Sequence, residues 1–153
     1  MTIQTTAGAT LHVSASQPAT YDSSGYAAIT WTAVGEITDL GEFGREYVLV
    51  KHNPIYTRAT KKLKGSYDEG ELAMQLASDT DDAGQIILKT ASQSDSDYSF
   101  KITMQNGDKY YGQAKVSKFK VAPGSVDNVV ALSATLAITT NTAGVGIVEA
   151  LAS

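Results

Sequence analysis

An alternation of apolar and polar residues with a period of two runs through this chain and constrains its fold more than any other feature. From Val130 to Thr139 every second residue is apolar or Ala, and those between are small or carry hydroxyl groups. The segments Tyr98 to Gln105 and Glu71 to Leu76 alternate in the same way. Successive side chains of a β-strand point to opposite faces of a sheet, so each segment predicts a strand with one buried face. The sequence therefore predicts a mainly β fold.

Turn signals connect some of these strands. Asn106-Gly107 after the second alternating segment predicts a tight β-hairpin. Its second strand is expected to run to about Lys120, because a Pro-Gly pair follows soon afterwards. Weaker patterns predict further strands at Ala28 to Thr32 and Lys61 to Lys64.

One helix is expected, from about Thr80 to Ser92. Asp79 can accept hydrogen bonds from the free amides of its first turn, and Asp81 and Asp82 complement the positive end of the helix dipole. Residues at intervals of four form its apolar face: Ala83, Ile87 and Ala91. A narrow face of this kind fits one helix lying on a sheet.

The length of 153 residues fits a single domain, expected to span 1–153. Two segments do not fit a compact core. Residues 41–66 predict an extended loop with a basic end, and long excursions in small domains are usually functional or disordered. Residues 140–153 are rich in Ala, Gly, Thr and Val, and predict a C-terminal arm that is either a flexible end or docks on a neighbour.

The motifs of catalysis and metal binding do not appear. There is no cysteine, and His12 and His52 lie far apart without ligands at metal-binding spacing. The run from Asp79 to Asp82 fails the EF-hand pattern, because Thr90 stands where a Glu is required. We therefore expect no enzyme, no cofactor and no metal. A carboxylate pair brought together only by folding stays open as an alternative.

Charge and hydropathy exclude two further classes. The net charge of −4 disfavours simple electrostatic binding of nucleic acid. The uncharged stretch from Asn128 to Val148 is interrupted by hydroxyl and amide residues, so membrane insertion is not expected. No secretory signal is expected at the start of the chain.

Five segments carry a resemblance to a known family. They are Trp31–Tyr47, Arg58 with Lys61–Tyr67, Leu76–Gln85, Tyr98–Thr103 and Gly124–Asp127. Through them the chain resembles the major tail tube proteins of siphophages, bacteriophages with long non-contractile tails. The resemblance covers about two-thirds of the sequence and keeps the family's order.

The resemblance implies a tail-tube-type β-sandwich or barrel flanked by one helix. Six copies would form a ring with a continuous inner β-barrel, and rings would stack into the tail tube through a long loop that reaches the next ring. The lumen would hold a tape measure protein and later pass the viral DNA into the host cell without binding it specifically. Tail terminator and distal tail or baseplate proteins would be partners at the two ends. The implied location is the virion tail, assembled in the host cytoplasm.

The basic excursion supplies the candidate contacts between subunits or rings, and its segment Lys51 to Lys64 is expected to face acidic groups of a neighbour instead of DNA. The candidate contacts are Phe43, Arg45, Tyr47, Lys51, Arg58, Lys61, Lys62 and Lys64. The strand face that carries Ser133 and Thr135 is small and polar enough for a water-filled wall, and an acidic protein would repel passing DNA.

Two other readings stay open. The fold is shared with the inner tubes of contractile tails and type VI secretion systems, so the chain could belong to one of those. It could also be a small β-sandwich module that recognises carbohydrate or a host surface, and Trp31 and the tyrosines leave room for this.

Overall fold

The computed structural model describes residues 3–151, and β-strands dominate it, as expected. The strands are β1 (Thr10–Ser14), β2 (Thr32–Val34), β3 (Ile37–Asp39), β4 (Glu46–His52), β5 (Lys61–Asp68), β6 (Glu71–Ala77), β7 (Tyr98–Thr103), β8 (Lys109–Ala122), β9 (Ala131–Thr139) and β10 (Val148–Ala150). The helices are α1 (Ser23–Ala27) and α2 (Ala83–Ser92).

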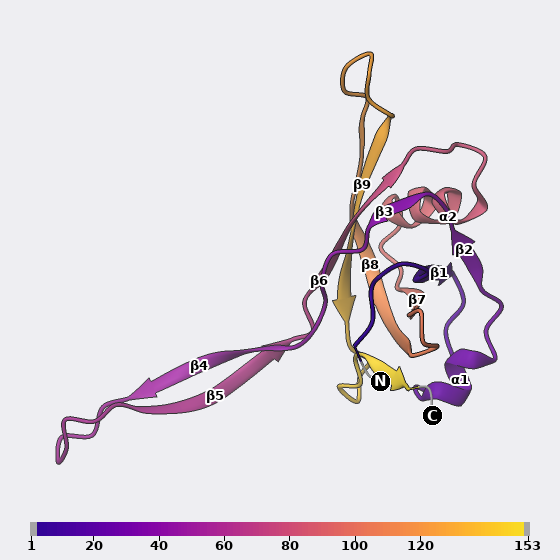
Figure 1. Ribbon diagram of the computed structural model, residues 1–153. Helices are drawn as coiled ribbons and strands as arrows, with labels where there is room; N and C mark the ends of the chain where they lie inside the picture. Colours follow the sequence, from indigo (N-terminus) through magenta and orange to yellow (C-terminus); the bar gives the residue numbers. More distant parts are fainter. Residues whose placement is uncertain (1–2, 152–153) are drawn as a thin grey trace.

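Eight of the strands form one curved antiparallel sheet (Figure 1). Its order is β2-β1-β7-β8-β9-β6-β3, with β10 beside β8. The two ends of this order, β2 and β3, are consecutive in the chain and are separated only by Gly35 and Glu36. Glu36 has a φ of 62°, which bends the chain sharply between the two strands. The sheet therefore curls around one core, as Figure 1 shows.

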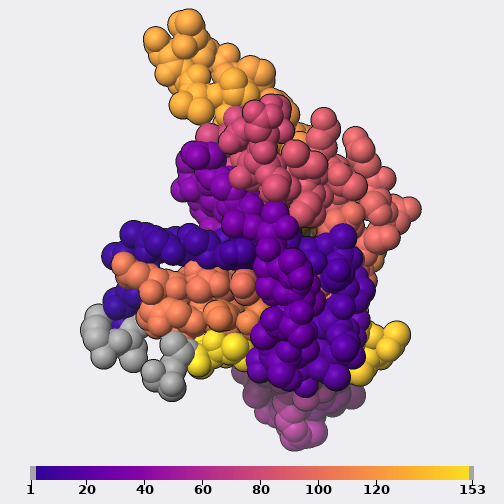
Figure 2. Space-filling view, turned by 90° about the vertical axis from the view of Figure 1, so that its right-hand side faces the viewer, coloured from indigo at the N-terminus to yellow at the C-terminus, as the bar shows by residue number. Residues whose placement is uncertain are grey.

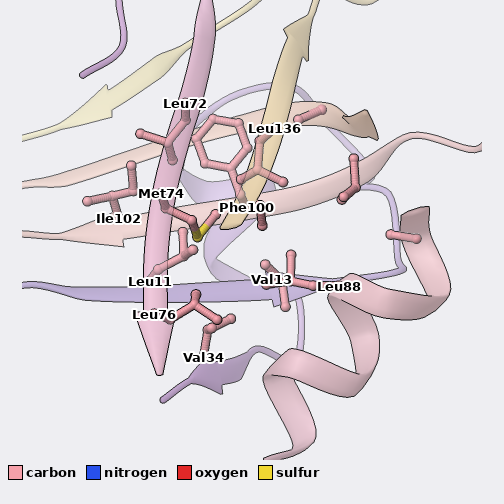
Figure 3. Packing of buried hydrophobic residues seen from close by; sticks show 14 of the residues in the cluster. Leu11, Val13, Val34, Leu72, Met74, Leu76, Leu88, Phe100, Ile102 and Leu136 are labelled. Atoms are coloured by element: carbon pink, nitrogen blue, oxygen red, sulfur yellow. The ribbon is translucent and has the colours of Figure 1, made fainter. Parts of the chain in front are cut away.

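The core is built from the inward faces of the alternating strands. Leu72, Met74 and Leu76 of β6 are at most 1% exposed, and β9 contributes Leu132, Ala134, Leu136 and Ile138. Figure 3 shows how side chains from β1, β6, β7, β9 and α2 converge there. The alternation thus predicts these buried residues correctly.

The Asn106-Gly107 hairpin between β7 and β8 is also confirmed. Gly107 has a φ of 96°, a conformation that only glycine adopts without strain. The strand expected at Ala28 to Thr32 is wrong, because Ala28 caps α1 and β2 begins at Thr32.

The helix expected near Thr80 exists, but it begins later. Asp82, and not Asp79, is its N-cap: its carboxylate accepts the amide of Gln85 at 3.0 Å. The buried face also differs from the expected one, since it consists of Gly84, Gln85, Leu88 and Ala91 while Ala83 is exposed. A Cβ at Gly84 would lie 2.3 Å from the carbonyl oxygen of Ala33, so a glycine allows α2 to pack closely on β2.

Gln85 and Asp82 join α2 to the bend between β2 and β3. The Gln85 side-chain amide donates to the carbonyls of Gly35 at 3.2 Å and Ala77 at 2.9 Å, and its oxygen accepts from the amide of Asp79 at 2.9 Å. The Gly35 amide donates to the Asp82 carboxylate at 3.1 Å. These bonds satisfy backbone groups at the point where the two sheet ends meet.

Two features extend beyond the body of the molecule. The paired strands β4 and β5, here called the arm, project away from the barrel on the side opposite to α2 (Figure 1). The segment 41–66, expected as a loop, thus contains the whole of β4 and most of β5. The β8–β9 loop, residues 123–130, extends in another direction and stands clear of the body in Figure 2.

The C-terminal segment folds back onto its own chain. Val148 to Ala150 form β10, which pairs with Tyr111 to Lys109 of β8. This strand continues along β8 where β9 ends. The C-terminal segment, which was expected to be flexible or to dock on a neighbour, therefore packs on its own chain as far as residue 150. Residues 152 and 153 of that prediction lie outside the described residues.

Candidate assembly surfaces

The arm is a two-stranded hairpin with two different faces. The register pairs Leu49 with Lys64, Val50 with Leu63 and Lys51 with Lys62. Strand alternation therefore places six residues on one face, here called the basic face: Tyr47, Leu49, Lys51, Lys62, Lys64 and Tyr67. The other face, here called the apolar face, carries Val48, Val50 and Leu63 between two polar pairs, Glu46 with Asp68 and His52 with Lys61.

The apolar face is largely open to solvent. Val48 is 61% exposed, Val50 48% and Leu63 60%. An isolated two-stranded hairpin is marginally stable in water, and a contiguous apolar patch of this kind usually marks a contact surface. The apolar face of the arm is therefore a candidate contact surface.

The basic face brings like charges together. Lys51 lies directly opposite Lys62, and in the described part of the chain neither lysine forms an ion pair. Like charges at opposed strand positions destabilise a hairpin. Lys64 instead lies over the Tyr47 ring, with its Nζ 4.6 Å from the ring centroid.

Two of the expected contact residues hold the base of the arm within the chain itself. Arg45 donates to the Glu69 carboxylate at 2.8 Å and lies 4.0 Å above the Tyr67 ring. Hydrogen bonds to Tyr47 and to Glu69 raise the pKa of Arg45. Phe43 packs edge-on against Tyr110, with ring centroids 5.3 Å apart. These two residues therefore orient the arm.

The end of the arm carries an exposed apolar pair beside cations. Ile55 and Tyr56 are 103% and 79% exposed. The Lys61 ammonium donates to the Tyr56 hydroxyl at 2.9 Å, and Arg58 lies two residues beyond Tyr56. We call residues 54–61 the arm tip.

β8 presents an unpaired edge over half of its length. Residues Lys109 to Ala114 pair with β7, whereas from Lys115 to Ala122 the strand pairs only with β9 in the described structure. An open edge of this length is available to another strand, and proteins usually cover or blunt such edges.

A groove lies between α2 and this distal half of β8. It has a volume of about 500 Å³ and is lined by Ile86 and Lys89 of α2, Phe119 and Val121 of β8, and Asp79 among others. Ile86 is 51% and Val121 55% exposed. β8 extends beyond the part of the core that α2 covers, so these apolar side chains remain exposed to solvent.

The outward face of β6, β8 and β9 carries the small polar residues noted in the sequence. Thr135 lies between Ala73 and Lys118, and Ser133 between Gln75 and Lys120. A row of lysines thus borders this face. The acidic net charge of the chain is therefore not located there.

The aromatic residues around α1 pack on one another. Tyr26 stacks on Tyr111 with ring centroids 5.3 Å apart, and Trp31 lies 6.1 Å from Tyr111. The Trp31 indole donates to the Tyr26 carbonyl at 3.1 Å. As expected for adjacent strand residues, Tyr110 contacts a different aromatic side chain, Phe43. Trp31 therefore belongs to a packed aromatic cluster. It is not part of an exposed row of aromatic side chains of the kind that would bind carbohydrate.

Residues 3–151 contain no group of three or more His, Asp or Glu side chains positioned to hold a metal ion. Burial, and then the charge of Lys101, lower the pKa of His12. No helix in this range is long and apolar enough to span a membrane.

No family model and no curated protein matches the sequence. Among the solved structures that share the fold are the following three. One is the sheath/tube terminator of an extracellular contractile injection system, PVC, in its extended state, with a TM-score of 0.65, 7% identity and 98% of both chains covered. Another is a chain of the anti-feeding prophage (AFP) baseplate, with a TM-score of 0.64, 7% identity and coverage of 89% of this chain and 91% of that chain. The third is the SPP1 tail tube, with a TM-score of 0.60, 16% identity and coverage of 94% of this chain and 77% of that chain. At these identities the likeness establishes a tail-tube-type fold, which the resemblance in the sequence had implied.

Proposed function

We propose that this chain is a structural subunit that polymerises with copies of itself into a tube. The observation that carries this proposal is the arm, in which nearly every strand residue is exposed to solvent although one face is apolar and the other is crowded with lysines. Its apolar face gains stability only when another molecule covers it. The fold shared with tube, terminator and baseplate proteins supports the same function.

The positions of the surfaces favour a head-to-tail contact. The arm projects from one side of the barrel, and the unpaired edge of β8 and the groove lie elsewhere (Figure 1). A contact between two different surfaces of the same chain is heterologous, and it produces closed rings or continuous stacks. We propose hexameric rings in which the open β8 edge pairs with a neighbouring copy, and stacking of these rings into a tube.

The finer assignment is to the tail tube of a siphophage, where the tube would conduct the viral genome into the host. The segments that resemble this family support it, and so does the fold of the SPP1 tail tube. Within this proposal the tape measure protein and passing DNA occupy the lumen, and terminator and baseplate proteins cap the ends. The role is mechanical and involves no catalysis.

The expectation that acidic charge in the lumen repels passing DNA needs one revision within this proposal. If the face with Ser133 and Thr135 lines the bore, Lys118 and Lys120 border it. Its small hydroxylated side chains, and not a negative charge, would then keep passing DNA from binding tightly.

A tube from a contractile tail or an injection system is the second candidate. The higher TM-scores, to the PVC terminator and the AFP baseplate chain, favour it. A sheath protein that binds the assembled tube would identify this candidate, because a non-contractile tail has no sheath.

Electron microscopy of the concentrated protein in negative stain tests the proposal. Hexameric rings or tubes would support it. A chain that stays monomeric even when seeded with tube ends would instead favour a small binding module. Hydrogen exchange gives a second readout: residues 41–66 should be protected only after assembly, and equal protection in both states would contradict the role of the arm.

A further inference from the structure

We propose that the arm tip of one copy docks in the groove between α2 and β8 of another copy. This inference rests on the proposed tube function and names the surface that receives the arm. It joins the most exposed apolar pair on the arm to an apolar groove elsewhere on the same chain.

The groove cannot be filled by the arm of its own chain. The arm leaves the barrel at the junction of β5 and β6 and points away from α2, as Figure 1 shows. Both features are therefore unoccupied within one molecule, and a second copy is needed to bring them together.

The two surfaces match in apolar character. The tip offers Ile55 and Tyr56, and the groove offers Ile86, Phe119 and Val121. A volume of about 500 Å³ is large enough for both tip side chains. Their burial would remove apolar area from water on both partners, which is the main favourable contribution to association.

The charges also match. Arg58 and Lys61 accompany the apolar pair of the tip, while Asp79 lines the groove. Lys89 is the opposing cation on the helix side of the groove. The carboxylate of Asp79 on one side and the ammonium of Lys89 on the other favour one orientation, in which the cations of the tip lie toward the loop before α2 and away from Lys89.

Disulfide crosslinking tests this contact cleanly, because the native chain has no cysteine. The double variant Ile55→Cys with Ile86→Cys changes two exposed positions and should fold normally. On oxidation after assembly it should give a ladder of covalent multimers. An equimolar mixture of the two single variants should give dimers and nothing larger, since each copy then carries one thiol.

The matched control pairs Ile55→Cys with Val126→Cys, a residue of the β8–β9 loop that is 97% exposed and lies outside the groove. It should remain monomeric on a non-reducing gel. Tubes that form normally without a ladder from the 55–86 pair, or with a ladder from the 55–126 pair instead, would overturn the docking and leave the tube function intact. If the cysteine-free parent forms no rings or tubes, the proposed function itself fails.

Discussion

Replacing the apolar face of the arm should separate assembly from folding. The variant carries Val48→Thr, Val50→Thr and Leu63→Thr. Threonine is β-branched like valine and is favoured in strands, so the hairpin should persist. In the free chain these three side chains are 48–61% exposed, and the stability of the free subunit should therefore hardly change.

The size of the assembly defect follows from those exposures. Full burial of a Val or Leu side chain contributes about 1.5–3 kcal/mol, and about half of each side chain remains to be buried, so three positions contribute roughly 2–4 kcal/mol per contact. Because 1.4 kcal/mol corresponds to a factor of ten, the critical concentration for tube formation should rise roughly 30- to 1,000-fold.

Sedimentation of assembled protein across a concentration series measures this quantity, and thermal unfolding of the free subunit controls for folding. Ile3→Thr, at a site 80% exposed outside the arm, serves as the matched control and should assemble normally. Tubes of the triple variant at the critical concentration of the parent would refute the reasoning, since the apolar face would then stay in water.

Three further predictions concern charge, stability and pH. Charge reversal of Lys61 and Lys62 should impair tube formation, and intact tubes of this double variant in electron micrographs would count against acidic partners for the arm. Gln85→Leu should lower the free energy of unfolding by about 2–4 kcal/mol, and Tm by roughly 5–15 °C, because it leaves three backbone groups without partners; calorimetry measures both. The pKa of His12 is lowered below 6.5 in the folded state, so the unfolded chain binds a proton more readily and stability should fall as the pH drops below about 6.5. His12→Gln should remove this part of the acid sensitivity in denaturant titrations, and an unchanged pH profile would exclude His12 as its source.

The strands that form the core were predictable because their pattern is local. β6, β7 and β9 each bury one face, and a period of two in the sequence reports that directly. The short strands β1, β2 and β3 show no clear period and were missed, although Leu11 and Val13 of β1 are completely or nearly buried. The start of α2 was misplaced for a related reason: several aspartates precede it, and only the contact with Gly35 selects Asp82 as the cap.

The candidate site was predictable only in part. The cluster of basic residues pointed to 41–66, but it could not reveal that Arg45 and Phe43 hold the base of the arm while Lys51 and Lys62 face each other on its open face. The groove beside α2 had no signal in the sequence, since its residues come from a helix and a strand that only the fold brings together.

The sequence by itself determined that strands form the core, that the chain turns at Asn106-Gly107 and that a helix, α2, packs on the sheet. Each of these features depends on residues that are close together in the sequence. Tertiary structure alone decided that the two ends of the sheet meet at Gly35 and Glu36, that half of β8 is paired on one side only, and that the arm leaves the barrel with its apolar face uncovered. Those outcomes depend on which strands pair across long separations, and no local period encodes that.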